Sequence, residues 1–225
     1  MNFESSKTLG GIGALLAFIA FILSFVFSYA GLVIGLVGII LILVGLRGLG
    51  DYYRERNIFT NAMYGFVALV IGIITAVGVS VATILMNLDN LKSFLLQIYP
   101  GWNGDWASLP NITPDPNAFS SGNFDFSIII AFLIGILAVI VVIWIFAIIA
   151  TFFIRRSLNK VSEQSTIGLF GTAGLLMLIG AVLTIVLIGV FLVWIGVLLL
   201  GIAFFQLRPS EPVVTSMPPA PPVTA

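Results

Sequence analysis

The chain has 225 residues, of which 60% are hydrophobic and only 8% are charged, whereas soluble globular domains carry roughly 25% charged residues. Nine Lys and Arg balance nine Asp and Glu, so the charge gives no reason to expect nucleic-acid binding. Because the chain contains neither His nor Cys, zinc sites, disulfides, Cys nucleophiles and His bases are excluded. The sequence predicts a membrane protein.

Four uncharged stretches are long enough to cross a bilayer, whose apolar core is about 30 Å thick and needs about 20 helical residues. The first and last stretches, residues 9–46 and 167–207, are about twice that length, so each must fold back as a hairpin. The sequence therefore predicts an all-α bundle of six transmembrane helices within residues 1–207. The expected spans are 9–29, 31–47, 60–86, 127–154, 167–188 and 190–207.

The turn of the first hairpin is predicted at residues 28–31, where polar and flexible residues interrupt the apolar run. The turn of the last hairpin is less marked and is expected near Gly189. Lys7 and the apolar run before Ser28-Tyr29-Ala30 also resemble a cleavable signal peptide, but the run exceeds the usual ~7 to 15 residues. We therefore expect the first span to be retained.

Positive charge predicts the orientation, because Lys and Arg near the ends of spans stay on the cytoplasmic side. Of the nine basic residues, only Lys92 lies on the other side, in the loop between spans three and four. Both termini are therefore expected in the cytoplasm. The eight residues on that side are Lys7, Arg47, Arg54, Arg56, Arg155, Arg156, Lys160 and Arg208.

The outer loop, residues 87–126, is expected to begin as an amphipathic helix that lies along the membrane interface, with Leu91 and Phe94 on its apolar face. Asn111-Ile112-Thr113 is an N-glycosylation acceptor in this loop. The spacing of its aspartates, such as Asp105, Asp115 and Asp125, matches no calcium loop. Residues 208–225 are rich in proline and are expected to form a disordered cytoplasmic tail.

Small residues recur every four positions in several spans, a spacing that lets helix backbones approach closely in lipid. We interpret them as packing seams inside the bundle, and the alternative is a homodimer face. The helix-packing residues are Ala68, Gly72, Ala76 and Ser80 in span three, Gly31 and Gly35 in span two, and Ala131 and Gly135 in span four. Span one adds Ala20, Ser24 and Ser28.

The first and last hairpins also align with each other at a shift of 160 residues, which pairs Leu15 with Leu175 and Ile19 with Ile179. A parallel duplication, as found in transporters, and chance similarity between leucine-rich segments both explain this match.

The predicted spans contain no Asp, Glu, Lys or Arg except Arg47 at the end of the second, although such groups usually mark a proton, ion or substrate path in a membrane protein. We expect the hydroxyls there to bond to the preceding turn of their own helix. Trp144 and Trp194 are interpreted as packing or lipid-facing residues. No catalytic, cofactor-binding or metal-binding residue is assigned. The polar residues of the spans are Ser24, Ser28, Thr75, Ser80, Thr83, Thr151, Thr172, Thr184 and Gln206.

Several short motifs resemble the archaeal and bacterial multi-pass membrane family known as domain of unknown function 996. They are residues 4–13, Gly45-Leu46-Arg47, Asp51-Tyr52-Tyr53 and residues 58–62. This resemblance implies an archaeal plasma-membrane protein and brings no assigned activity. The order of short and long outer loops is also similar to that of tetraspanins, but the lack of Cys and the two additional spans depart from that layout.

Two functions follow as hypotheses. The first is a non-enzymatic membrane scaffold or accessory subunit, because uncharged spans with small-residue seams offer contact surfaces and no reactive groups. Its expected partners are membrane lipids, further copies of itself or other membrane proteins. The alternative is a channel or facilitator for a small neutral solute, suggested by the possible repeat and by the hydroxyls in the spans.

Overall fold

The computed structural model of the protein describes residues 2–118 and 127–209, and every regular element within them is a helix. The predicted all-α class and the six long apolar helices are confirmed. The elements are α1 (Phe3–Val26), α2 (Ser28–Tyr52), α3 (Arg56–Met86), α4 (Leu88–Ile98), the 3-10 turn η1 (Leu109–Asn111), α5 (Ser127–Ser165), α6 (Gly168–Leu183), the 3-10 turn η2 (Thr184–Val186) and α7 (Ile188–Gln206).

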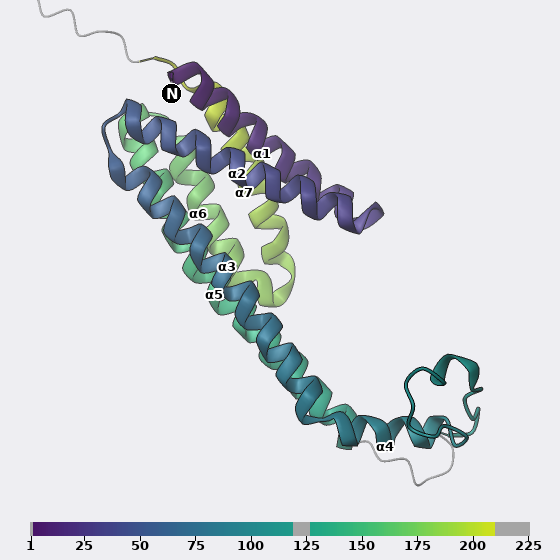
Figure 1. Ribbon diagram of the computed structural model, residues 1–225. Coiled ribbons are helices and arrows are strands. Elements are labelled where there is room, and N and C mark those ends of the chain that lie inside the picture. Colours follow the sequence, from purple (N-terminus) through teal and green to yellow (C-terminus); the bar gives the residue numbers. More distant parts are fainter. Residues whose placement is uncertain (1, 119–126, 210–225) are drawn as a thin grey trace, which may run out of the picture.

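The six long helices form three antiparallel pairs that close into a ring. α1 pairs with α2, α3 with α5, and α6 with α7 (Figure 1). The pairs are joined where α2 contacts α3, α5 contacts α6, and α7 contacts α1. Each helix therefore packs mainly against two others, and all six face the middle of the ring.

The α3–α5 pair is longer than the two hairpins. α3 has 31 residues and α5 has 39, whereas α7 has 19. At 1.5 Å per residue, α3 is about 46 Å long and α7 about 28 Å, which is close to the thickness of a bilayer core. The indole Nε1 of Trp144 donates to the carbonyl of Val182 at 3.1 Å, so the end of α6 lies beside the middle of α5. The α3–α5 pair continues past this point to α4 (Figure 1).

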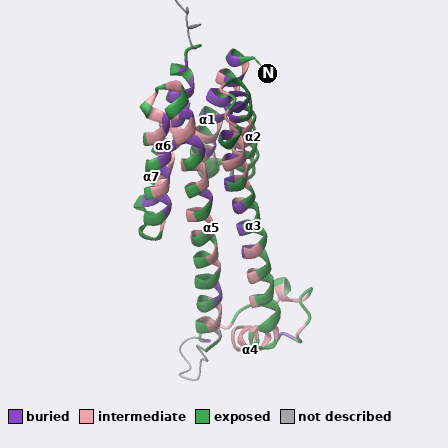
Figure 2. Cartoon of the chain, turned by 90° about the vertical axis from the view of Figure 1, so that its left-hand side faces the viewer, coloured by how far each residue is buried: buried purple, intermediate pink, exposed green. Residues whose placement is uncertain are grey.

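The hydrophobic core lies at the end of the ring that is remote from α4 (Figure 2). The rings of Phe170 and Phe204 meet edge to face there, with centroids 5.3 Å apart. Ser157 is also fully buried, and its hydroxyl donates to the carbonyl of Ile58 at 2.6 Å, which links α5 to α3. We call this the core end. Its largest fully buried apolar side chains are Leu49, Ile58, Leu158, Val161, Phe170, Phe204 and Leu207.

The first hairpin turns earlier than the sequence predicts. Instead of spans 9–29 and 31–47, α1 runs from Phe3 to Val26 and α2 begins at Ser28, so that Phe27 alone joins them. Gly31 lies inside α2, where an added Cβ would be 2.6 Å from the backbone nitrogen of Ser24. The glycine therefore permits close packing of the two helices and does not form the turn.

The turn of the last hairpin also lies earlier than the predicted spans 167–188 and 190–207 imply, and again the glycine expected near the turn lies in a helix contact. α6 ends at Leu183, and the turn consists of η2 and Leu187, which has a φ of 63°. Gly189 lies inside α7 and packs against the carbonyl of Gly180. Leucine thus adopts the left-handed conformation that glycine usually supplies, because the nearby glycine is needed for helix contact.

α3 and α5 extend beyond the predicted spans 60–86 and 127–154 at the core end. α3 already begins at Arg56, and α5 continues to Ser165, where Thr166, with a φ of 58°, follows. Charged residues leave the bilayer without ending a helix, so the apolar run underestimates the helix length. The predicted tail, 208–225, lies outside the described residues from position 210 onward.

Candidate functional site

The small residues of α3 and α5 lie between these two helices. An added Cβ at Gly72 would be 2.5 Å from the Cβ of Phe146, and Gly135 lies against the side chain of Thr83. Among the residues predicted to mediate packing here, Ala68, Gly72, Ala76 and Gly135 are buried, and Ser80 and Ala131 are half-buried. The Gly72 face is therefore covered by α5 of the same chain, and a second copy would have to bind elsewhere.

The glycines of α2 pack against α1. In the α1–α2 hairpin, Gly31 is buried and Gly35 is half-buried. Gly38 and Gly45 were not predicted as packing residues, although Gly31, Gly38 and Gly45 are spaced seven residues apart, which keeps them on one helix face. An added Cβ at Gly38 would be 2.7 Å from the carbonyl oxygen of Gly13. The seven-residue spacing could have identified this seam.

The hydroxyls in the predicted spans bond to their own helices, and this prediction is confirmed for seven side chains. Each donates to a backbone carbonyl three or four residues earlier, at 2.7 to 3.2 Å. Their protons are therefore already used in hydrogen bonds along the helices. The seven residues are Ser24, Thr75, Ser80, Thr83, Thr151, Thr172 and Thr184.

The two tryptophans of the spans connect helices. The ring of Trp194 stacks on that of Phe18 with centroids 4.5 Å apart, and its Nε1 donates to the Phe18 carbonyl at 3.0 Å. This fixes α7 to α1, as Trp144 fixes α5 to the end of α6. Both residues contribute to packing, in line with the interpretation from the sequence.

An apolar cavity of about 440 Å³ lies where the six helices meet. The side chains of Thr151 and Thr184 reach it, and the remaining walls are aliphatic and aromatic. The cavity was not predicted from the sequence, because its walls come from positions between 17 and 200 that share no motif. Each long helix contributes, for example through Phe21, Leu46, Phe66, Ala147, Ala181 and Trp194.

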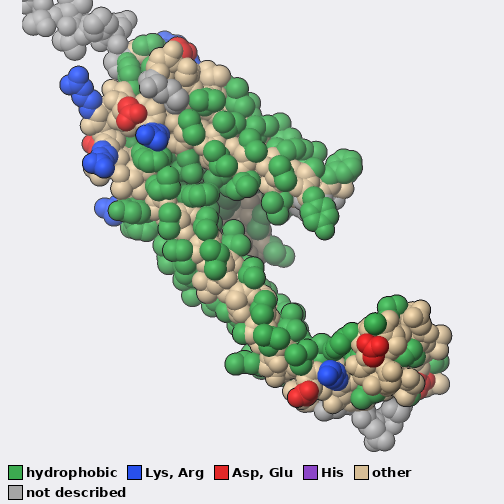
Figure 3. Space-filling view, viewed as in Figure 1, with side chains coloured by type: hydrophobic (Ala, Val, Ile, Leu, Met, Phe, Trp, Pro, Cys, Tyr) green, Lys and Arg blue, Asp and Glu red, His purple; other side chains and the backbone are tan. Residues whose placement is uncertain are grey.

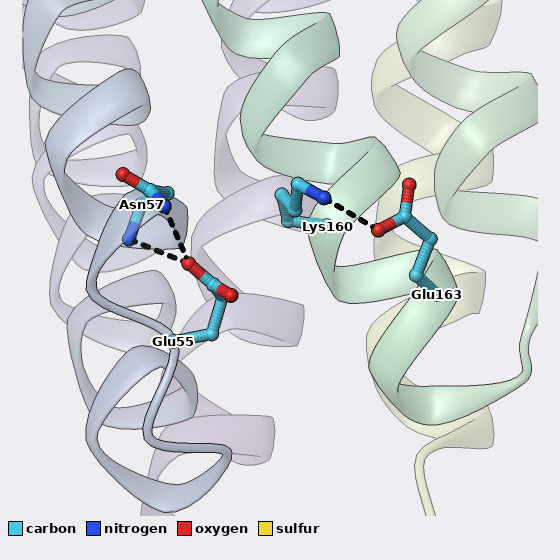
Figure 4. Close-up of polar contacts among 4 residues, drawn as sticks. All are labelled: Glu55, Asn57, Lys160 and Glu163. Carbon is cyan, nitrogen blue, oxygen red and sulfur yellow. Dashed lines mark hydrogen bonds and ion pairs between the residues drawn. The ribbon is translucent and has the colours of Figure 1, made fainter.

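Charged side chains gather at the core end, on the surface around the buried residues (Figure 3). Lys160 and Glu163 form an ion pair at 2.7 Å, and the carboxylate of Glu55 accepts a hydrogen bond from the side-chain amide of Asn57 at 2.7 Å (Figure 4). Burial raises the pKa of Tyr53 in the same region. The Glu55–Asn57 bond lies where the connector between α2 and α3 ends, whereas the Lys160–Glu163 pair lies within α5.

α4 and the residues after it form a cap beyond the α3–α5 pair. The predicted amphipathic helix is present as α4, and the side chains of Leu91 and Phe94 line a shallow apolar groove together with residues of α5. The Asp115 N–H donates to the Ile98 carbonyl at 2.7 Å and ties the later part of the loop to α4. The buried Trp102 donates from Nε1 to the Asp105 carbonyl at 2.6 Å.

The carboxylates of the cap stabilise turns of the chain by accepting hydrogen bonds from the backbone. The carboxylates of Asp105 and Asp115 each accept a backbone N–H from two residues further along the chain, at 3.1 and 2.9 Å. Asn111 lies exposed in η1, so its amide is accessible for the predicted glycosylation. Asp125, the third aspartate singled out in this loop, lies outside the described residues.

Comparison with known proteins identifies the family. Residues 34–198 match the family described as protein of unknown function (DUF996). An uncharacterised protein of Methanocaldococcus jannaschii is 24% identical over 210 residues, which cover 92% of this chain and 94% of that protein. No solved structure matches the chain.

The family match begins inside α2, so the motif at residues 4–13, which carried part of the resemblance seen in the sequence, lies before it. The match nevertheless includes the rest of α2 and reaches well into α7, and thus most of the ring of helices. With its six helices long and apolar enough to cross a membrane, the chain belongs to the DUF996 family of multi-pass membrane proteins.

Proposed function

We propose that the protein is a non-enzymatic scaffold or accessory subunit of a membrane complex, which binds membrane lipids and either further copies of itself or other membrane proteins. The observation that carries this proposal is the apolar surface of the α3–α5 pair beyond the hairpin turns. Ile134 and Leu137 on α5 and Leu85 and Met86 on α3 are each at least 60% exposed.

The chemistry of the helices agrees with such a role. Binding between helices in lipid depends on close packing of small and apolar side chains, which these helices provide. The hydroxyls of the spans are bonded within their own helices and offer no donor to a polar substrate. We also propose that the protein lies in the plasma membrane with both termini in the cytoplasm. The core end carries eight of the nine basic residues, which supports this orientation.

Native mass spectrometry of the full chain, extracted gently from its own membrane, tests this proposal. A defined oligomer or a stoichiometric foreign subunit is expected. Replacing Ile134 and Leu137 together by Ala should weaken that association. The matched control replaces Leu36 and Ile40 on α2, a pair of the same composition that is 48% and 46% exposed, and should leave the association intact. A lone monomer in every extract would contradict the scaffold role.

A second candidate is a facilitator for a small neutral solute, which the cavity between the six helices favours. Such a solute would pass Thr151 and Thr184, but the core end would have to open, since Leu46 and Leu158 are buried there. Flux measurements in liposomes test this role. If neither glycerol nor water crosses faster than through protein-free liposomes, the facilitator is excluded for solutes of that class.

A further inference from the structure

We propose that the cavity between the six helices is a binding site for one hydrocarbon chain of a membrane lipid, which enters from the end near the hairpin turns. This inference does not depend on the scaffold role, because it concerns the interior of the ring and not the outer surface of α3 and α5.

The residues that line the cavity extend along the helices. Its walls follow α5 through Ala147, Thr151 and Leu158, and follow α7 from Val190 to Leu200. Eleven residues of helix correspond to a length of about 15 Å. With a volume of about 440 Å³ over that length, the cavity is too narrow for a helix, which is about 10 Å across.

The walls suit hydrocarbon and not a polar ligand. The Thr151 hydroxyl donates to the Ala147 carbonyl at 2.8 Å, and the Thr184 hydroxyl donates to the Gly180 carbonyl at 2.8 Å. The indole N–H of Trp194 is likewise bonded to a carbonyl of α1. A polar solute would lose its hydrogen bonds to water without replacement, whereas a methylene chain has none to lose.

One end of the cavity is closed and the other is open. Leu46, Leu158 and Leu200, at the core end, are at most 3% exposed, whereas Phe21 and Val190, near the hairpin turns, are half-buried. The α1–α2 hairpin diverges from α3 with distance from the core end, and a recess separates them (Figures 1 and 3). A chain can therefore enter with its methyl end leading toward the core end.

The bilayer around the helices can supply the lipid chain that fills the cavity. The six helices are long and apolar enough to span a bilayer, so the medium next to the recess is hydrocarbon. Protein interiors are packed as densely as organic crystals, and an empty apolar cavity of this size forfeits the dispersion contacts of its whole lining. A lipid chain restores these contacts without bringing a polar group into the ring.

The test uses the full-length protein in phosphatidylcholine vesicles that contain a phosphatidylcholine with a diazirine at the end of one chain. After illumination, mass spectrometry of peptides locates the adducts. We expect them on cavity-lining residues such as Met177 and Ala181, which are nearly inaccessible from the outer surface of the ring.

Two variants with the same substitution on the same helix provide the comparison. Ala147→Leu fills the cavity and should lower adduct formation on α6 by about tenfold, because overpacking of an apolar site costs enough to displace a chain. Ala138→Leu changes an exposed position of α5 outside the cavity and should leave the labelling unchanged. Thr151→Val should also preserve labelling, whereas a polar solute path would be impaired by loss of the hydroxyl.

Gel filtration and melting temperature establish that each variant is folded, and Ala17→Leu, on the wall formed by α1, replaces Ala147→Leu if that variant does not fold. Equal adduct yields on α6 in the folded filling variant and in Ala138→Leu would overturn the proposal. So would adducts confined to the outer surface of the helices, which would mean that the probe contacts the protein only as bulk lipid.

Discussion

The helices of the two hairpins and those of the α3–α5 pair differ in how much of their surface is buried and in the contacts that hold them together. In the most apolar stretch of each helix, 33% of the residues are buried in α1, α6 and α7 and 22% in α2, compared with 17% in α3 and only 6% in α5. The hairpin helices are neighbours in sequence and meet through tight glycine contacts. α3 and α5 are separated by the 40-residue outer loop, and their far halves pack mainly on each other.

This difference indicates that the hairpins and the α3–α5 pair have different structural roles. The hairpins are shorter than the α3–α5 pair and, together with its core-end half, close the ring around the cavity. The α3–α5 pair extends from Trp144 to Ser127 beyond the end of α6, which is about 26 Å of helix, and presents apolar side chains to its surroundings. The hairpins thus build the interior, and the long pair supplies surface.

The largest effect is expected from labelling single cysteines with a membrane-impermeant maleimide, because the chain contains no natural Cys. In intact cells, Ala107→Cys in the cap should react, and Gln164→Cys at the end of α5 should react only after permeabilisation. Val186→Cys, in the turn of the last hairpin, should react weakly in both cases, because this turn lies beside the middle of α5 in the apolar zone.

Strong labelling of Val186→Cys from outside would reverse one half of the comparison. It would mean that the hairpin turn reaches water and that the α3–α5 pair projects from the bilayer. Labelling of Gln164→Cys without permeabilisation would instead invert the orientation, with both termini outside.

The close contact inside the last hairpin should be the most sensitive to substitution. Gly189→Ala places a Cβ against backbone atoms of Gly180 and Thr184, which cannot rotate away, so we expect a loss of about 3 kcal/mol. Gly78→Ala on the exposed side of α3 meets nothing within 4 Å and should gain about 0.5 kcal/mol from helix propensity. Unfolding by dodecyl sulfate in mixed micelles measures both, and similar stabilities would contradict the assigned contact.

Substitution in the α3–α5 contact should cost less stability than substitution in the last hairpin, and a second substitution should restore part of the loss. Gly72→Leu collides with Phe146, so stability should fall by about 2 kcal/mol. Phe146→Ala makes room for the new side chain, and the double variant should recover about 1 kcal/mol relative to additivity. Phe152→Ala, at an exposed position of α5, is the control and should add its effect independently. A change in oligomeric state without loss of monomer stability would place Gly72 at an interface between copies.

The smallest effect should come from the bond between the long pair and the hairpin turn. Trp144→Phe removes the hydrogen bond to the Val182 carbonyl and should cost about 1 kcal/mol. Faster hydrogen exchange is expected in residues 182–190 and not in the turn of the first hairpin. Unchanged exchange in that segment would show that the bond does not hold the turn against α5.

Much of the fold was accessible from the sequence because each span must satisfy its own backbone hydrogen bonds and be apolar along its length. This constraint predicts the number of long helices, and the amphipathic spacing of the outer loop predicts the helix at Leu88–Ile98. It does not predict the turns. The flexibility of Gly31 and Gly189 favours the prediction of a turn at each, yet both glycines lie in helix contacts. Phe27 and Leu187 lie in the turns instead.

The sequence by itself determined that the chain is a bundle of six long apolar helices with basic residues gathered at one end, since composition and hydropathy act along the chain. Only the tertiary structure decided that Gly72 faces Phe146, that the six helices form a ring and that a cavity lies within it. The reason is that in lipid almost every helix face is equally apolar, so partner choice depends on shape, and shape arises between residues remote in sequence.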